Sequence, residues 1–165
     1  MAYFFELAAE CGSEREAAEV FGNHFDGFRI VLLAASKELS TVCQFEVWQD
    51  SEGNWWCIVV PSGVSQTGRE DNVIKSQNQV FEVVEGLYER LKTAPAFRYA
   101  VVGFEVIPFD TYSELVEAKG PAHEPFGGLV LDQHLWEEIE RPSGYVKFSE
   151  GAYWFPFRKE DLRCG

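Results

Sequence analysis

The sequence predicts an α+β fold with a mainly antiparallel sheet of about five strands. Three observations support this: a clear hairpin in the first third of the chain, two segments with helical periodicity, and a composition of 46% hydrophobic and 15% aromatic residues. A chain of 165 residues with that composition is long enough to bury a core. We therefore expect residues 1–165 to form a single domain, with a sheet-and-helix core over 1–109 and a covering C-terminal segment over 110–165.

The hairpin spans residues 41–61. In its first strand apolar side chains alternate with polar ones, as in Cys43-Gln44-Phe45-Glu46-Val47, which is the period-two pattern of a half-buried strand. Residues 50–54 have the composition of a turn, and residues 55–60 return as a strand that is apolar on both faces. The expected register is given by three facing pairs: Gln49 with Trp55, Val47 with Cys57, and Cys43 with Pro61. Because the two cysteines do not face each other, we expect buried free thiols.

Hydrophobic periodicity completes the core. Strands are expected over 2–10, 28–35 and 98–107, and helices over 13–27 and 72–93. The second helix is expected to begin after an N-cap at Asp71 or Asn72, and Gly86 inside it favours close packing on the sheet. The resulting order β-α-β-β-β-α-β is that of a ferredoxin-like fold with one added strand, which places two helices on one face of the sheet.

The other face of the sheet also needs a cover, because three of the strands are apolar on both sides. The C-terminal third is expected to supply it. Thr111 and Asp132 have the sequence context of helix N-caps, and the tail 151–157 (GAYWFPF) holds four aromatic residues. We expect this aromatic area to close the core. A homodimer that covers the sheet is the alternative.

Charge is the strongest global signal. The chain has 27 acidic residues against 14 lysines and arginines, a formal net charge of −13. A field of this sign repels phosphate backbones, so no nucleic-acid binding is expected, and it attracts basic proteins. The first 61 positions contain ten acidic residues but only three basic ones, Arg15, Arg29 and Lys37. The pattern favours a basic protein partner, although solubility alone also explains an acidic surface.

Signals for a membrane, a cofactor or a metal are not apparent. No apolar run approaches the roughly 20 residues of a membrane span, and the N-terminus lacks the basic start of a secretory signal, so we expect a cytoplasmic protein without membrane contact. Gly63 and Gly68 have the spacing of a phosphate-binding loop, but Arg69 and Glu70 stand where Lys and Ser/Thr are needed. His134 is interpreted as a surface histidine beside a helix cap. We therefore expect no cofactor and no metal site.

Candidate site residues fall into two sets. No pair of acidic side chains stands out as a general acid and base, so no catalytic residue is assigned, and a binding protein is favoured over an enzyme. Carboxylates on two helix faces, with tryptophans as aromatic anchors, form the predicted partner-binding set: Trp48, Glu82, Glu85, Glu89, Trp136, Glu137 and Glu138. The alternative is a ligand pocket near the 62–72 loop, lined by Ser65, Arg69, His123, Tyr153 and Trp154.

The leading hypothesis from the sequence is an acidic cytoplasmic protein-binding module. One form of it is an immunity-type inhibitor that docks on a basic toxin or nuclease, a comparison that rests on size, charge and the absence of catalytic motifs. Two alternatives remain open: a small-molecule-binding protein or uncharacterised enzyme, and a structural homo-oligomer.

Overall fold

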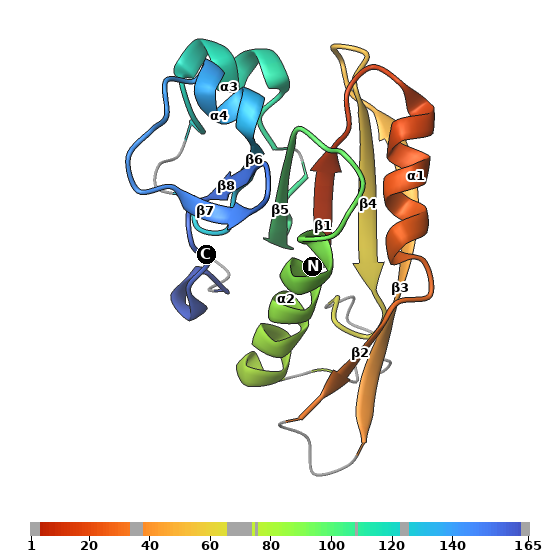
Figure 1. The fold of residues 1–165 in the computed structure, drawn as a ribbon. Coiled ribbons are helices and arrows are strands. Elements are labelled where there is room, and N and C mark those ends of the chain that lie inside the picture. The colour runs from red at the N-terminus through yellow and green to blue at the C-terminus, as the bar shows by residue number, and fades with distance from the viewer. Residues whose placement is uncertain are drawn as a thin grey trace.

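The computed structural model describes residues 4–33, 38–65, 74, 76–107, 109–122 and 126–162. Its helices are α1 (Arg15–Phe25), α2 (Gln77–Leu91), α3 (Tyr112–Ala118), α4 (Gln133–Glu138) and a 3-10 turn η1 (Lys159–Leu162). Its strands are β1 (Phe5–Glu10), β2 (Arg29–Leu32), β3 (Leu39–Gln49), β4 (Trp55–Pro61), β5 (Tyr99–Phe104), β6 (Val130–Asp132), β7 (Val146–Ser149) and β8 (Ala152–Trp154). The fold is α+β, and the described strands form one antiparallel sheet in the order β2-β3-β4-β1-β5-β6-β8-β7 (Figure 1).

The β3–β4 hairpin has the predicted register. All three expected pairs are present: Gln49 with Trp55, Val47 with Cys57, and Cys43 with Pro61. The turn is held by Asp50, whose carboxylate accepts hydrogen bonds of 2.9 Å from the backbone N–H groups of Glu52 and Asn54 and from the indole N–H of Trp56. The two hairpin cysteines are buried free thiols, as predicted.

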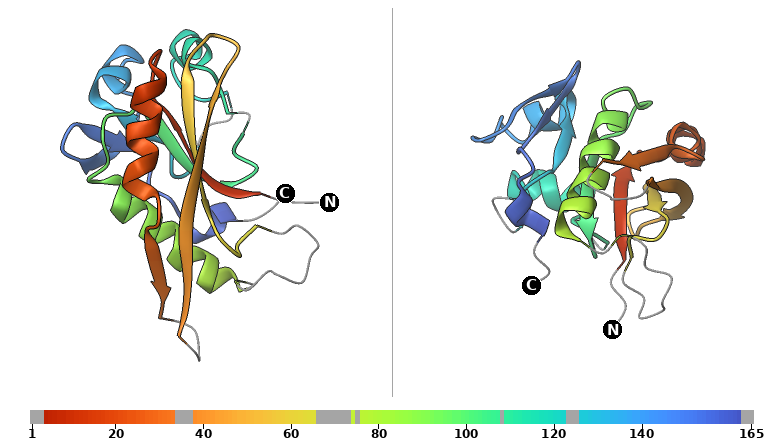
Figure 2. Two further views of the ribbon diagram at one scale, coloured as in Figure 1. Left: turned by 90° about the vertical axis from the view of Figure 1, so that its right-hand side faces the viewer. Right: turned by 90° about the horizontal axis from the view of Figure 1, so that it is seen from below.

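Each face of the sheet has its own core, because successive residues of a strand point to opposite sides. Phe5, Leu7 and Ala9 of β1 pack in the core beneath α1 and α2, which lie on the same side of the sheet (Figure 2). Ala8 points to the other side and packs with apolar side chains of β4, β5, α3 and α4. Figure 1 shows α3 and α4 near one end of the strands only. The second face is therefore covered over part of its length.

The prediction of about five strands is wrong, and the ferredoxin-like order does not describe the whole sheet. The described chain has eight strands. From β1 to β5 the elements succeed one another as expected, but β6, β8 and β7 extend the sheet beyond β5. These strands come from the C-terminal segment, which both covers and lengthens the sheet. Strands β6 and β8 have 3 residues each, too few to display a period-two pattern.

Helix α2 begins later than predicted. Its N-cap is Ser76, whose hydroxyl accepts a hydrogen bond from the backbone N–H of Gln79, while the Gln79 side chain accepts one from the backbone N–H of Ser76, both at 3.2 Å. Asp71 and Asn72, the predicted caps, lie outside the described residues. The close packing predicted for Gly86 is confirmed, since a Cβ built on it would lie 2.8 Å from Cγ2 of Ile30.

The two helix caps predicted in the C-terminal segment are both present. Thr111 and Glu114 form a reciprocal capping box at α3. At α4 the Asp132 carboxylate accepts a hydrogen bond from the backbone N–H of Leu135 at 2.7 Å. In the part of the chain that the structure describes, no helix has the length and apolar character needed to cross a membrane.

Candidate functional site

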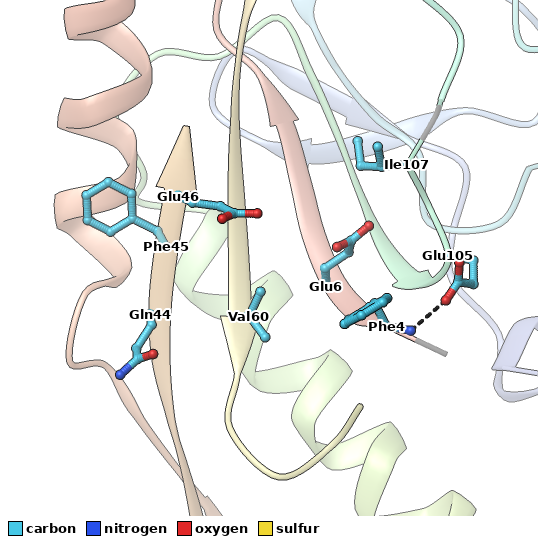
Figure 3. Close-up of a pocket in the computed structure, with 8 residues that line it drawn as sticks. All are labelled: Phe4, Glu6, Gln44, Phe45, Glu46, Val60, Glu105 and Ile107. Atoms are coloured by element: carbon cyan, nitrogen blue, oxygen red, sulfur yellow. Dashed lines mark hydrogen bonds between the residues drawn. The ribbon is translucent and has the colours of Figure 1, made fainter. Parts of the chain in front are cut away.

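The uncovered part of the second sheet face forms a cavity of about 520 Å³. We call it the acidic cavity, because three of its lining residues are glutamates. The lining comes from β1 and the residue before it, from β3 and β4, and from the segment after β5 (Figure 3): Phe4, Glu6, Gln44, Phe45, Glu46, Val60, Glu105 and Ile107. The Phe45 ring points toward α1 and away from the three carboxylates, so Phe45 belongs mainly to the first core (Figure 3).

Strand alternation places two of the glutamates in the cavity. Glu6 lies one residue from Phe5 and Leu7 and so points away from the first core. Its partner on β5 is Gly103, which adds no side chain beside it. Glu46 lies on β3 opposite Ile58 of β4, a residue of the second core. Glu6 of β1 and Glu46 of β3 thus line the cavity from the two strands on either side of β4.

Glu105 lines the cavity just beyond β5 and forms two hydrogen bonds with the backbone of Phe4. Its carboxylate accepts a hydrogen bond of 2.6 Å from the backbone N–H of Phe4, drawn in Figure 3, and its own N–H donates to the Phe4 carbonyl at 2.8 Å. Its φ is +52°, in the left-handed region. Such a backbone costs a non-glycine residue on the order of 1–3 kcal/mol, which the surrounding contacts offset.

Burial makes Glu6 an unusual carboxyl. Only 9% of its surface is exposed, and this burial raises the pKa of the group from 4.5 to about 7. A hydrogen bond from the backbone N–H of Ile107 opposes the rise, and the neighbouring charges of Glu105 and Glu46 add to it. Among the described residues the lining contains no lysine, arginine or histidine, and none of the three carboxylates forms an ion pair.

This arrangement suits an extended organic cation. In the described part of the chain no three His, Cys, Asp or Glu side chains converge in the way that metal ligands do. The carboxylates instead stand around an open volume with apolar surface from Phe4, Val60 and Ile107 between them. An arginine side chain matches both features, because its guanidinium carries five N–H donors and its stem packs on apolar walls. A lysine ammonium offers three donors and the same kind of stem.

Known proteins offer no guide to this cavity. No protein-family model, curated protein or solved structure matches the chain. A function is therefore inferred from the cavity itself and from the charge of the chain.

The predicted partner-binding residues of α2 lie outside the acidic cavity. Glu82 accepts a hydrogen bond of 2.6 Å from the backbone N–H of Leu33, which ties α2 to the end of β2. Glu85 and Glu89 are exposed on α2, where Glu89 pairs with Lys92 at 2.5 Å. These three carboxylates follow one helix, but only Glu85 and Glu89 line a common cavity, described below.

The other predicted partner-binding residues belong to the second core and its rim. Trp48 is half-buried and stacks on Trp56, with ring centroids 6.1 Å apart, and Trp136 stacks on Tyr153 at 3.7 Å. Both tryptophans are thus packed within the chain. Of the carboxylates on α4, Glu137 accepts hydrogen bonds from Gln133 and Arg141, and Glu138 accepts one from the hydroxyl of Tyr112. The structure does not bring the seven residues into one patch.

The predicted pocket near the 62–72 loop remains a prediction. Arg69 and His123 lie outside the described residues. The Ser65 hydroxyl accepts a hydrogen bond of 3.0 Å from the backbone N–H of Phe5. Tyr153 and Trp154 are neighbours on β8 and point to opposite faces, Tyr153 toward Trp136 and Trp154 toward Tyr88. All four aromatic residues of the tail, Tyr153, Trp154, Phe155 and Phe157, contact other aromatic rings of the chain.

Proposed function

We propose that the chain is a protein-binding module that recognises a basic protein through the acidic cavity. A lysine or arginine side chain of the partner enters the cavity and lies among Glu6, Glu46 and Glu105. The observation that carries the proposal is the buried Glu6 carboxyl, which has two further carboxylates beside it and no cation in the described lining. A buried carboxylate is stabilised when a cation pairs with it, so the partner's charge supplies what the cavity lacks.

The net charge of the chain supports the same proposal. At −13 the molecule attracts basic partners over distances set by the Debye length, about 8 Å at physiological salt. Such steering raises association rates, while the cavity provides the specific contact. A narrower form of the proposal is an immunity-type inhibitor, in which the partner is a basic toxin or nuclease. In that form the captured toxin or nuclease is inactive in the complex.

A peptide experiment tests the cavity directly. Binding of a blocked Gly-Arg-Gly peptide and its uncharged citrulline analogue is measured by calorimetry or NMR titration. We expect the arginine peptide to bind and the analogue to bind at least about tenfold more weakly, since the analogue keeps the shape but loses the charge. The variant Glu6→Gln/Glu46→Gln should abolish the preference.

The control is Glu117→Gln/Glu160→Gln, which removes the same charge from two exposed positions outside the lining. If the control weakens binding as much as the cavity variant, only the overall field acts and the cavity is not the site. The wild type, the cavity variant and the control then serve as bait for basic partners from the source cells. A partner retained by the control and lost by the cavity variant supports the proposal.

A further inference from the structure

A second cavity lies on the side of the sheet that carries α2, between that helix and the β7–β8 hairpin. We call it the α2 groove; its volume is about 450 Å³. Its lining is dominated by aromatic side chains and contains two carboxylates and one lysine: Phe81, Val84, Glu85, Tyr88, Glu89, Lys92, Phe148, Trp154 and Phe157. It shares no residue with the acidic cavity. A ligand of the groove therefore binds at a site separate from the acidic cavity, and its binding does not rest on the function proposed above.

Helical spacing and a short hairpin bring these residues together. On α2 the lining residues follow at intervals of three and four, which places them on one stripe: Phe81, Val84, Glu85, Tyr88 and Glu89. Across the groove, Phe148 of β7 and Trp154 of β8 face α2 from two paired strands. Gly151, with a φ of +76°, makes the turn between those strands.

The rings of the groove meet at steep angles. Tyr88 and Trp154 have centroids 5.1 Å apart and planes inclined by 64°, and Phe148 and Trp154 are 5.0 Å apart and inclined by 56°. The groove therefore presents several ring faces and edges rather than one flat wall. The Tyr88 hydroxyl donates to the carbonyl of Gly128 at 2.8 Å and accepts from the N–H of Val102 at 3.3 Å. The Tyr88 hydroxyl is therefore directed into the protein.

Cations of the chain already contact two of these rings. The ammonium of Lys92 lies 5.9 Å from the ring centroid of Phe148, and that of Lys159 lies 5.9 Å from the centroid of Phe81. Lys92 is neutralised by Glu89. Glu85 projects from the middle of the stripe, is exposed, and forms no ion pair or hydrogen bond with any described residue. The groove thus joins aromatic faces to one carboxylate, that of Glu85, which pairs with no cation among the described residues.

We propose that the α2 groove binds a quaternary ammonium group, between Trp154 and Phe157 on one side and Glu85 on the other. Aromatic faces attract cations through their quadrupole, and a trimethylammonium group has no N–H that would need an acceptor. Its methyl groups also bury apolar area against the rings. The Glu85 carboxylate adds a Coulomb attraction, which distinguishes the site from a purely apolar groove.

The experiment compares a charged ligand with a neutral one of the same shape. Choline, a peptide with one trimethyl-lysine, the same peptide with unmodified lysine, and the neutral 3,3-dimethylbutan-1-ol are titrated in NMR experiments on the full chain. We expect choline to bind at least about fivefold more tightly than the neutral alcohol. Glu85→Gln should weaken choline binding about threefold, as expected for one exposed charge, and Glu117→Gln on α3 should leave it unchanged.

Comparing the affinity of the trimethyl-lysine peptide with that of choline identifies the source of the ligand. Tighter binding of the trimethyl-lysine peptide than of choline assigns the site to a methylated side chain, and the reverse assigns it to a free small cation; either supports the proposal. Trp154→Leu should remove choline binding, measured at a temperature at which the variant is folded. If that variant is unstable, the charge comparison and Glu85→Gln still decide. Equal binding of choline and the alcohol, or no binding of any ligand, overturns the proposal.

Discussion

The carboxylate of Glu10 and the guanidinium of Arg98 form a two-pronged ion pair between β1 and the residue preceding β5. Nε lies 2.6 Å from Oε2, and Nη2 lies 2.6 Å from Oε1. The Glu10 side chain is fully buried, whereas 29% of the Arg98 side chain is exposed. The same guanidinium carbon lies 3.8 Å from the ring centroid of Tyr112 in α3. The pair therefore connects the central strands to the helix that covers the second face.

Glu10→Gln should destabilise the protein by about 2–4 kcal/mol, because it leaves a partly buried guanidinium without its counter-charge. Urea denaturation measures the loss. Arg15→Gln is the control, since it breaks the exposed pair between Arg15 and Glu19 and should cost no more than about 0.5 kcal/mol. Similar losses in the two variants would contradict a special role for the buried pair.

Glu6 should make stability depend on pH in the direction opposite to most carboxylates. Its pKa is raised from 4.5 to about 7, so the folded state holds a proton that the unfolded chain has released between those values. The free energy of unfolding therefore falls as pH rises through this window. Glu6→Gln mimics the neutral form. Relative to wild type, it should gain about 1–3 kcal/mol on going from about pH 5 to about pH 8.

Denaturation curves of both proteins at the two pH values provide the test. Glu117→Gln on α3, an exposed position, should follow the wild type across the range. A Glu6→Gln curve parallel to the wild-type curve would show that this carboxyl titrates like an ordinary one.

Local sequence patterns predicted a helix or strand where that element was long enough to display its period. Residues 43–47 of β3 alternate between apolar and polar side chains, and the adjoining turn fixes where the return strand begins, so the facing pairs of the hairpin could be assigned. Strands β6 and β8 have 3 residues each and depend on pairing, since β6 pairs with the edge of β5 and β8 pairs with β6; no local pattern records such pairing. The start of α2 could have been predicted from the sequence, since Ser76 and Gln79 have the spacing of a capping box.

The acidic cavity illustrates what sequence reasoning could and could not reach. Glu6 and Glu46 occupy polar positions of alternating strands, so their orientation away from the first core was readable. The burial of Glu6 and its closeness to the other two carboxylates could not be predicted, because they depend on where α3 and α4 stop covering the sheet. Glu105 was missed for another reason. It follows the end of β5 in a left-handed conformation, and no pattern places a glutamate there.

Gly86 is expected to be indispensable for packing although it weakens its helix. Gly86→Ala should gain up to about 1 kcal/mol of helix propensity and lose about 1–3 kcal/mol from the contact with Ile30, a net destabilisation. In an Ile30→Ala background the obstacle is removed, and the same substitution should become stabilising. A double-mutant cycle by urea denaturation measures this change of sign. If the effects of the two substitutions on the free energy of unfolding simply add, the contact with Ile30 is not the reason that position 86 needs glycine.

Binding of a cation in the acidic cavity should depend on the ionisation of Glu6, which follows from the function proposed for the cavity. With a pKa of about 7, roughly one-tenth of this carboxyl is ionised at pH 6 and nine-tenths at pH 8. The affinity for the blocked Gly-Arg-Gly peptide should therefore rise about tenfold over this range, since only the charged form pairs with the guanidinium. The peptide does not titrate there, and no histidine is among the described residues of the lining. Glu6→Gln should bind more weakly with a flat profile, whereas Glu117→Gln should keep the wild-type slope. A slope that survives Glu6→Gln would assign the titration to another group and separate the pH effect from this carboxyl.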